Sequence, residues 1–258
     1  MKTIYFAGYG FSSFKINRLY LFALLICLGL TGCATGPSAN SADPLEPFNR
    51  SMYKFNDAVD QAVLKPVATA YQDVTPKLVR QGIGNFFGNL SDAWSVVNSV
   101  LQLKAEAAVS NLMRVSFNTI FGLGGILDVA TELKLERHKE DFGQTLGHWG
   151  VGAGPYIVLP ILGPSTLRDT VALSVDFKGD ALSQFSDIPV RNALLATRVV
   201  DIRAGFLKAE SVINDGALDK YSFIRDAFLQ RRRNAVYDGN PPDEASPEDA
   251  EPVETPAK

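Results

Sequence analysis

Apolar residues recur every three or four positions through most of this chain, which is the period of an amphipathic α-helix. The first such stripe consists of Phe48, Met52, Phe55, Val59 and Val63. It predicts a helix that ends before Pro66, because a proline disfavours helical backbone in the residue before it. No convincing run of alternating apolar and polar residues appears, so we expect no regular sheet. The pattern therefore predicts the all-α class.

Residues that typically begin or end helices place further helices along the chain. A side chain that accepts a backbone hydrogen bond favours a helix start, and glycine favours a helix end. Thr75–Pro76 and Asp92 are expected to begin the second and third helices, and the fourth is expected at about 104–120. Asp141 and Ser165 are expected to be the N-caps of two more helices. The last two helices are expected at about 189–214 and 218–236.

The first 33 residues have the parts of a bacterial export signal. Lys15 and Arg18 precede an apolar run of 12 residues, Leu19–Leu30. This run is too short for a membrane-spanning helix, which needs about 20 apolar residues. It ends in Leu30-Thr31-Gly32-Cys33, which resembles the lipobox in which the cysteine is acylated and becomes the new N-terminus. An ordinary signal peptide or a buried cysteine is the alternative.

The predicted lipobox divides the chain into four parts. Residues 1–32 are the signal peptide, and residues 33–42 form a lipidated, flexible tether of small and polar residues. Residues 43–238 form the folded helical domain. Residues 239–258, with five prolines and six acidic residues against one lysine, form a disordered tail. Acyl chains on Cys33 attach the protein to a membrane, and the absence of aspartate after this cysteine indicates the outer membrane.

One segment departs from the helical pattern. Residues 143–167 contain no charged side chain but have six glycines and three prolines, so they cannot form a regular spanning helix. Their most apolar part, Val151–Gly163, is 13 residues long. Such a stretch would promote aggregation in water, so it belongs either in the protein core or in lipid. Trp149 and Tyr156 are suited to a lipid headgroup boundary.

Composition and motifs exclude several classes of function. The formal net charge of −3 lacks the basic excess that nucleic-acid binding requires, so we expect no nucleic-acid partner. Two cysteines and two histidines are too few for a zinc cluster built from these residues alone. No G-x-S-x-G or Walker motif is present. The residues alone predict a lipid-anchored, all-helical, non-enzymatic envelope protein without a catalytic or metal site.

Seven short motifs follow one another along the body of the chain. They are Asp43–Arg50, Asn118–Gly125, Glu140–Gly147, Gly150–Gly152, Gly154–Tyr156, Leu159–Pro160 and Gly163–Asp169. In this order they resemble the MlaA/VacJ family of outer-membrane lipoproteins. The resemblance extends from about Asp43 to Val236, nearly the whole folded part, and the predicted lipobox agrees with it independently.

This resemblance implies a helical, ring-like, monotopic membrane protein that lies in the inner leaflet of the outer membrane around an amphipathic channel. Members of the family remove misplaced phospholipids from the outer leaflet. They pass these lipids to a soluble periplasmic carrier, from which an ATP-driven complex returns them to the inner membrane. They associate with trimeric porins and use no cofactor. The alternatives are a structural porin-associated lipoprotein without its own lipid-conducting role and, third, a membrane-bound lipid hydrolase.

The positions of the family motifs predict which residues line the channel or contact lipid. They are Asn49, Arg50, Asn118, Trp149, Tyr156, Arg168 and Asp169. A phosphate in hydrocarbon is costly, so a channel for phospholipid needs a polar track. A capping or surface role is the alternative for each polar residue. The basic triplet at 231–233 suits the C-terminal end of a helix dipole, with contact to anionic lipid as the alternative.

Overall fold

The computed structural model describes residues 43–242. The predicted signal peptide, the acylation site Cys33 and the tether precede this range, and most of the predicted acidic tail follows it. These expectations lie outside the described residues and stay predictions. Within the described range the chain is mainly helical, as the apolar periodicity predicts.

Helices account for most of the described elements. None of them is both long and apolar enough to span a bilayer. In chain order the elements are α2 (Glu46–Val59), the π-helical turn η2 (Asp60–Leu64), α3 (Lys65–Val74), α4 (Lys77–Leu101), α5 (Ala105–Ile120), α6 (Val129–Glu132), α7 (Phe142–His148), β1 (Tyr156–Leu159), β2 (Gly163–Thr166), α8 (Leu167–Gly179), the 3-10 turn η3 (Ala181–Gln184), α9 (Ile188–Gly216) and α10 (Lys220–Val236).

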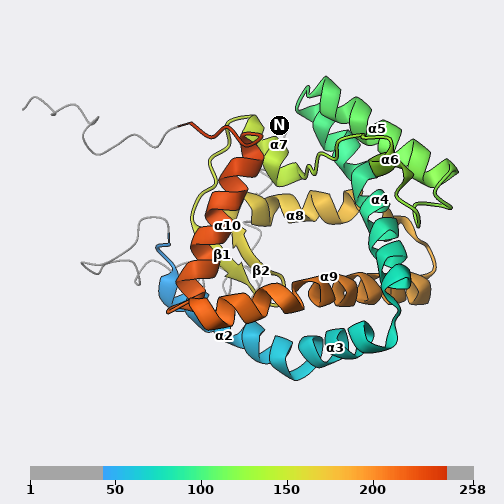
Figure 1. The fold of residues 1–258 in the computed structure, drawn as a ribbon. Coiled ribbons are helices and arrows are strands. Elements are labelled where there is room, and N and C mark those ends of the chain that lie inside the picture. Colours follow the sequence, from blue (N-terminus) through green and yellow to red (C-terminus); the bar gives the residue numbers. More distant parts are fainter. Residues whose placement is uncertain (1–42, 243–258) are drawn as a thin grey trace, which may run out of the picture.

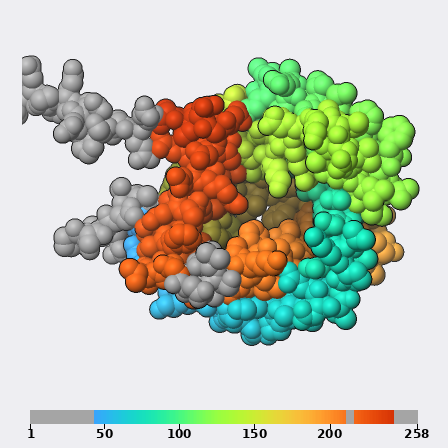
Figure 2. Space-filling view, viewed as in Figure 1, coloured from blue at the N-terminus to red at the C-terminus, as the bar shows by residue number. Residues whose placement is uncertain are grey.

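The helices are arranged in a ring (Figure 1). α3 packs against α9 along one side of the ring, and α4 forms the next side with α5 packed against it, away from the centre. α10 lies opposite α4, and α7 and α8 pack together between them. The space-filling view shows this face of the molecule hollowed at its centre (Figure 2). The predicted ring-like helical arrangement is confirmed.

A proline lies inside a continuous helical stretch and not at its end. The chain stays helical from α2 through η2 into α3, which contains Pro66, so the predicted end before this residue is wrong. In the π turn the N–H of Lys65 bonds to the carbonyl of Asp60, five residues back. The backbone is therefore widened directly before a residue that has no N–H to donate. Arg203 of α9 holds this turn by donating to both carboxylate oxygens of Asp60, at 2.6 and 2.7 Å.

Asp92 lies in the middle of a helix and not at the start of one. α4 continues without interruption through this position, so the predicted boundary between a second and a third helix is wrong. The carboxylate of Asp92 is buried, and the Nε atom of Arg137 donates to it at 2.6 Å. The Nε atom of Arg114 lies 3.7 Å away. Asp92 therefore balances positive charge inside the protein and caps no helix.

The other predicted helix ends agree with the structure to within a few residues. Asp141 caps α7 as predicted, because its carboxylate accepts a hydrogen bond from the N–H of Gln144 at 2.9 Å. The cap of α8 is Thr166 and not the predicted Ser165. The Thr166 hydroxyl accepts a hydrogen bond from the N–H of Asp169 at 3.2 Å. Both residues suit an N-cap, so the sequence alone does not choose between them.

The segment 143–167 is irregular, as predicted, but it also contains a β-hairpin. Strands β1 and β2 are antiparallel, with Tyr156 opposite Thr166. Tyr156 and Val158 point into the core, and the residues between and after them are less buried. Each strand has four residues, which is too short for the alternation to stand out in a single sequence. The fold is mainly helical, and the hairpin lies in the segment whose structure the helical pattern leaves open.

Two asparagines of α2 hold the outer edge of β1. The side chain of Asn49 donates to the carbonyl of Tyr156 at 3.0 Å and accepts from the N–H of Val158 at 2.8 Å. Two turns later, Asn56 pairs in the same way with a carbonyl and an N–H further along the hairpin, at 2.8 and 2.7 Å. The two side chains take the place of a neighbouring strand, so these backbone groups are satisfied.

Replacing Asn49 with alanine is expected to lower the free energy of unfolding by about 2–4 kcal/mol, because buried backbone groups of β1 lose their partners. Asn49 is fully buried, and its amide also donates to Asp43 at 2.8 Å. Thermal and chemical unfolding in detergent measure the change. Asn192→Ala, at an exposed position of α9, is the matched control. Equal stability of the two variants would contradict a structural role for the Asn49 side chain.

Candidate functional site

Polar side chains are buried in this protein, and large apolar ones lie at its surface. Among the described residues, 19 polar or charged side chains are buried but only 12 hydrophobic ones. At the same time Leu103 is 90% exposed and Leu123 is 70% exposed, and many other large apolar side chains are exposed with them. A water-soluble domain shows the opposite preference at its interior, and extended apolar surface marks contact with a protein or a membrane.

The clearest group of exposed apolar side chains lies in the turn after α5. We call residues 120–127 the apolar turn; its exposed members are Ile120, Phe121, Leu123, Ile126 and Leu127. Glycines make this turn possible. A Cβ on Gly122 would lie 2.2 Å from a backbone oxygen, and Gly124 and Gly125 have φ values of +75° and +95°. The glycines of this motif therefore fold the chain back while the apolar side chains face outward.

A buried polar network holds the base of the apolar turn. Asn118 donates to the carboxylate of Asp128 at 3.1 Å and accepts from the N–H of Ala130 at 2.9 Å. Arg114 donates to both oxygens of the same carboxylate, each at 3.0 Å. Burial raises the pKa of Asp128, but hydrogen bonds from Thr131 and Asn118 and the charge of Arg114 outweigh it, so this pKa is lowered. The apolar turn is thus presented on a hydrogen-bonded, charge-paired base.

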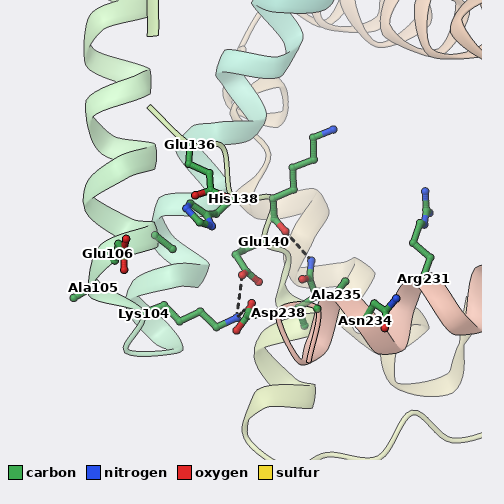
Figure 3. Close-up of a pocket in the computed structure, with 14 residues that line it drawn as sticks. Lys104, Ala105, Glu106, Glu136, His138, Glu140, Arg231, Asn234, Ala235 and Asp238 are labelled. Atoms are coloured by element: carbon green, nitrogen blue, oxygen red, sulfur yellow. Dashed lines mark hydrogen bonds and ion pairs between the residues drawn. The ribbon is translucent and has the colours of Figure 1, made fainter. Parts of the chain in front are cut away.

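A polar pocket of about 700 Å³ opens between the start of α5, residues 136–140 and the end of α10 (Figure 3). The ammonium group of Lys104 lies 3.0 Å from a carboxylate oxygen of Glu140 and 2.5 Å from one of Asp238. Glu140 is buried, and Gln102 donates to its other oxygen at 2.9 Å. Acidic and basic residues are mixed along the wall, so the pocket favours neither sign of charge.

An ion cluster joins α7, α8 and α10. We give this name to Asp141, Arg168, Asp169 and Arg232. Arg232 donates to both oxygens of Asp141, each at 2.6 Å, and to both oxygens of Asp169, at 2.7 and 3.0 Å. The Nε atom of Arg168 donates to Asp169 at 2.9 Å. One carboxylate therefore serves two guanidinium groups, and one guanidinium ties three helices together.

The charges of this cluster stabilise one another. Burial lowers the pKa of Arg232, but its hydrogen bonds with Asp141 and Asp169 outweigh burial and raise that pKa above its ordinary value. Burial raises the pKa of Asp141, but the hydrogen bond and charge of Arg232 lower it below the ordinary value. Asp141 and Arg232 therefore each stabilise the charged form of the other.

Two glycines of α7 make room for the two arginines. A Cβ on Gly143 would lie 2.4 Å from a terminal nitrogen of Arg232, and a Cβ on Gly147 would lie 2.6 Å from one of Arg168. Four residues apart, the glycines lie on one face of the short helix. Their place in the motif Glu140–Gly147 therefore has a packing reason, which is the close approach of guanidinium groups to the helix backbone.

Three of the residues nominated by motif position are buried and bonded within the protein. Asn49 holds the hairpin, Asn118 holds the base of the apolar turn, and Tyr156 is 1% exposed in the core beside Tyr221 and Phe228. The ring of Tyr156 therefore does not lie at the surface. α2 and α5 lie in different parts of the ring, so these residues do not form one site (Figure 1).

The other nominated residues are divided between the surface and the ion cluster. Arg50 is partly exposed and lies 2.7 Å from carboxylate oxygens of both Glu46 and Asp219. Trp149 is 53% exposed, and its Nε1 atom donates to the carbonyl of Leu101 at 3.1 Å. The two nominated residues of α8 belong to the ion cluster. Trp149 is thus the nominated side chain most available for contact with lipid.

Arg232, the centre of the ion cluster, was not among the predicted site residues. A signal for it is present in the sequence, because it lies on the inner face of α10, where arginines alternate with apolar residues. That face consists of Tyr221, Arg225, Phe228, Arg232 and Val236. Arginine at two positions of an apolar stripe indicates buried partners of opposite charge.

Comparison with known proteins agrees with the fold and with these motifs. The family model described as "MlaA lipoprotein" matches residues 41–235. The Shigella flexneri protein named "Intermembrane phospholipid transport system lipoprotein MlaA" is 38% identical over 78% of this chain and 82% of its own length. The Haemophilus influenzae protein of the same name is 34% identical over 86% of this chain and 92% of its own length.

A solved structure has the same fold. It was described under the words "Structural basis for maintenance of bacterial outer membrane lipid asymmetry". It superposes with a TM-score of 0.67 at 36% identity, over 75% of this chain and 98% of the other. The match of the family model to most of the chain, together with these relatives, decides the assignment. This chain belongs to the MlaA lipoprotein family.

Proposed function

We propose that this chain is a lipid-anchored, non-enzymatic phospholipid conduit that maintains the lipid asymmetry of the outer membrane. It takes phospholipids that are misplaced in the outer leaflet, conducts them through an amphipathic channel in the ring, and passes them to a soluble periplasmic carrier for return to the inner membrane. The observation that carries this proposal is the reversed distribution of side chains, with apolar surface outside and polar groups buried within.

Short apolar segments at the surface suit a protein embedded in one leaflet. A single leaflet offers about 15 Å of hydrocarbon, half of the roughly 30 Å core of a bilayer. The apolar turn and the exposed apolar residues of the hairpin loop, Ile161 and Leu162, are short apolar segments of the kind that such a depth can take up. The relatives named for intermembrane phospholipid transport support this placement.

A path for phospholipid must accept two kinds of chemistry. The phosphate of the headgroup costs several kcal/mol in hydrocarbon, whereas the acyl chains need apolar contact. The hollow at the centre of the ring is bordered by helices that carry polar residues among apolar ones (Figure 2). Binding and release suffice for this function, so no covalent bond of the lipid changes and incubation with phospholipid yields no lyso-phospholipid.

The place and partners of the protein follow from the same proposal. Acyl chains on Cys33 hold it to the periplasm-facing leaflet of the outer membrane, because two or more chains give stable attachment. A trimeric porin is its neighbour in that membrane, and the periplasmic carrier meets it from the aqueous side. These partners rest on the family resemblance.

Deleting the gene is expected to raise outer-leaflet phospholipid, and the wild-type chain is expected to restore the barrier. Palmitoylation of lipid A and access of external phospholipase report the lipid in that leaflet. A Cys33→Ala chain in the same strain shows how far anchoring is needed, and Cys27→Ala, which changes a cysteine of the predicted signal peptide, is the matched control.

Each alternative function predicts a different result. An unchanged outer leaflet in the deletion strain would contradict the conduit. A variant that keeps porin binding but loses lipid removal would count against a purely structural porin adaptor. Release of lyso-phospholipid by the purified protein would favour a hydrolase.

A further inference from the structure

The chain passes from α8 to α9 through the 3-10 turn η3, on the side of the ring that α4 forms (Figure 1). We call residues 177–191 the α8–α9 corner. Leu182 is fully buried in it. The carbonyl of Lys178 accepts hydrogen bonds from the side chains of Ser183 and Gln184, at 3.2 and 2.7 Å, which fold η3 back onto the end of α8. The corner is therefore a packed part of the fold.

Four large apolar side chains of the corner nevertheless lie at the surface. They are Phe177, Phe185, Ile188 and Val190, and they are between 39% and 57% exposed. Each of these side chains would gain free energy by leaving water. A group of this kind marks contact with a protein or a membrane.

Two cations of the same corner have no partner within the described chain. No hydrogen bond or ion pair of the described residues involves the side chain of Lys178 or that of Arg191. The carboxylate of Asp180 lies 2.6 Å from Arg198, and that of Asp187 accepts a backbone hydrogen bond at the start of α9, at 3.0 Å. Two free cations therefore stand against the one carboxylate of Asp187, and the corner keeps a net positive charge.

The cations and the apolar side chains must be covered by one partner, because they alternate. Lys178 directly follows the exposed Phe177, and Arg191 directly follows the exposed Val190. An anionic membrane offers negative headgroups directly above hydrocarbon, which matches both kinds of side chain. Each lysine or arginine near such a surface adds attraction, which falls off within a Debye length. A zwitterionic membrane offers the apolar contact alone.

We infer that the α8–α9 corner contacts the surface of a membrane and prefers anionic to zwitterionic phospholipid there. The choice of a membrane as the partner rests on the proposed function. The preference for an anionic headgroup rests on the free cations Lys178 and Arg191 beside exposed apolar side chains. The inference thus names a class of headgroup, which the conduit alone leaves open.

The test uses the full-length protein, purified from membranes and reconstituted into phosphatidylcholine vesicles. Ser186 is exposed within the corner, so Ser186→Cys can carry a fluorescent nitrobenzoxadiazole label. Wild-type protein treated with the same reagent measures any label on the native cysteines. Spin-labelled phosphatidylglycerol and spin-labelled phosphatidylcholine are the two quenchers. The phosphatidylglycerol is expected to reach half-quenching at an at least fivefold lower mole fraction, because two cations attract it to the corner.

Removing the two cations is expected to remove this preference. In the labelled protein, Lys178→Gln together with Arg191→Gln should bring the two quenchers to within about twofold of each other, since only apolar contact remains. Lys139→Gln together with Arg231→Gln is the matched control. It removes one lysine and one arginine at the polar pocket, beside the end of α10, and is expected to keep the preference.

Two further measurements keep the test sharp if the glutamine variant perturbs the fold. Lys178→Arg together with Arg191→Lys keeps both charges and is expected to keep the preference for phosphatidylglycerol. Raising the salt concentration from 0.1 to 1 M shortens the Debye length from about 10 to about 3 Å. In the unchanged corner this is expected to abolish the preference while both lipids still quench.

Equal quenching by the two lipids at low salt would overturn the preference, and so would a preference that survives in the glutamine variant. Quenching by neither lipid would overturn the assignment to a membrane and would leave a protein as the partner of the corner. The outer-leaflet measurement on the deletion strain does not depend on this surface, so failure here and failure of the proposed function are distinguishable.

Discussion

Arg232→Met is expected to destabilise the folded chain by about 3 kcal/mol, because removing one partner leaves the others of a buried ion pair uncompensated. Methionine fills a similar volume, so the loss is one of charge and hydrogen bonds and not of packing. The side chain of Arg232 is 14% exposed and that of Asp169 is 10% exposed, so little solvent replaces the lost interaction. Asp141, at 37%, is partly screened and contributes less.

Thermal unfolding of the purified protein in detergent measures this effect. A loss of about 3 kcal/mol corresponds to a fall of roughly 6–12 °C in the unfolding temperature of a domain of this size. Arg231→Met is the matched control, since this exposed neighbour lies outside the ion cluster. Equal unfolding temperatures of the two variants would show that the cluster contributes no net stability.

The stability that Arg232 and Asp141 provide is expected to depend on pH in one direction. The pKa of Asp141 is lowered in the folded state by Arg232, so its contribution is complete above its unfolded pKa of about 3.9. That contribution is lost as the pH falls through the lower, folded pKa. The difference in stability between wild type and Arg232→Met is therefore expected to be constant near neutral pH and to shrink below about pH 4.

Periodicity and capping chemistry account for the parts of the fold that the sequence predicts well. α9 and α10 follow from long apolar stripes, and the start of α7 follows from a single aspartate. These signals are local, since each depends on residues within one or two turns of a helix. The helices themselves are therefore predictable from short stretches of the chain, whereas the ring arrangement was expected only from the family resemblance.

The predictions that failed depend on contacts between distant residues. Asp92 has the chemistry of an N-cap, but its position in α4 is decided by Arg137, far along the chain. Pro66 normally ends a helix, but a π turn that Arg203 holds from α9 lets the helix continue. Arg232 was predicted to complement the dipole at the end of a helix. It instead binds Asp141 at the start of α7 and Asp169 of α8, which lie far from it in the sequence. The motifs predicted Arg168 and Asp169 of the ion cluster as site residues but not Arg232, which joins its helices.

Two aspartates in the apolar turn are expected to weaken binding of the protein to a membrane. If the ring lies in one leaflet, placing aspartate at Phe121 and Leu123 removes apolar surface from the membrane and puts two charges there. Each aspartate costs about 2.5–3.5 kcal/mol in the centre of a bilayer. The two side chains are 63% and 70% exposed, and the ring contact that the fold loses is that of Phe121 with Phe117, at 5.8 Å between centroids. Leu123 has a φ of +55°, which aspartate adopts more readily than leucine.

The experiment removes the acyl anchor so that the surface alone decides binding. Residues 1–33 are replaced by a cleavable signal peptide without a lipidation cysteine, and the secreted protein is mixed with phospholipid vesicles and floated on a density gradient. The unaltered sequence is expected to float with the vesicles. The Phe121→Asp, Leu123→Asp variant is expected to float at least about tenfold less, because the expected cost is several times the roughly 1.4 kcal/mol that a tenfold change requires.

A control with the same net charge separates local from general repulsion. Ala245→Asp together with Ala250→Asp adds two charges to the acidic tail and is expected to float like the unaltered sequence. If both double variants float equally well, the apolar turn does not enter lipid. Its exposed leucine and phenylalanine side chains then need a protein partner, because apolar surface of this kind is not left open to water. Either result identifies what covers the apolar turn, the property on which the placement of the ring in one leaflet depends.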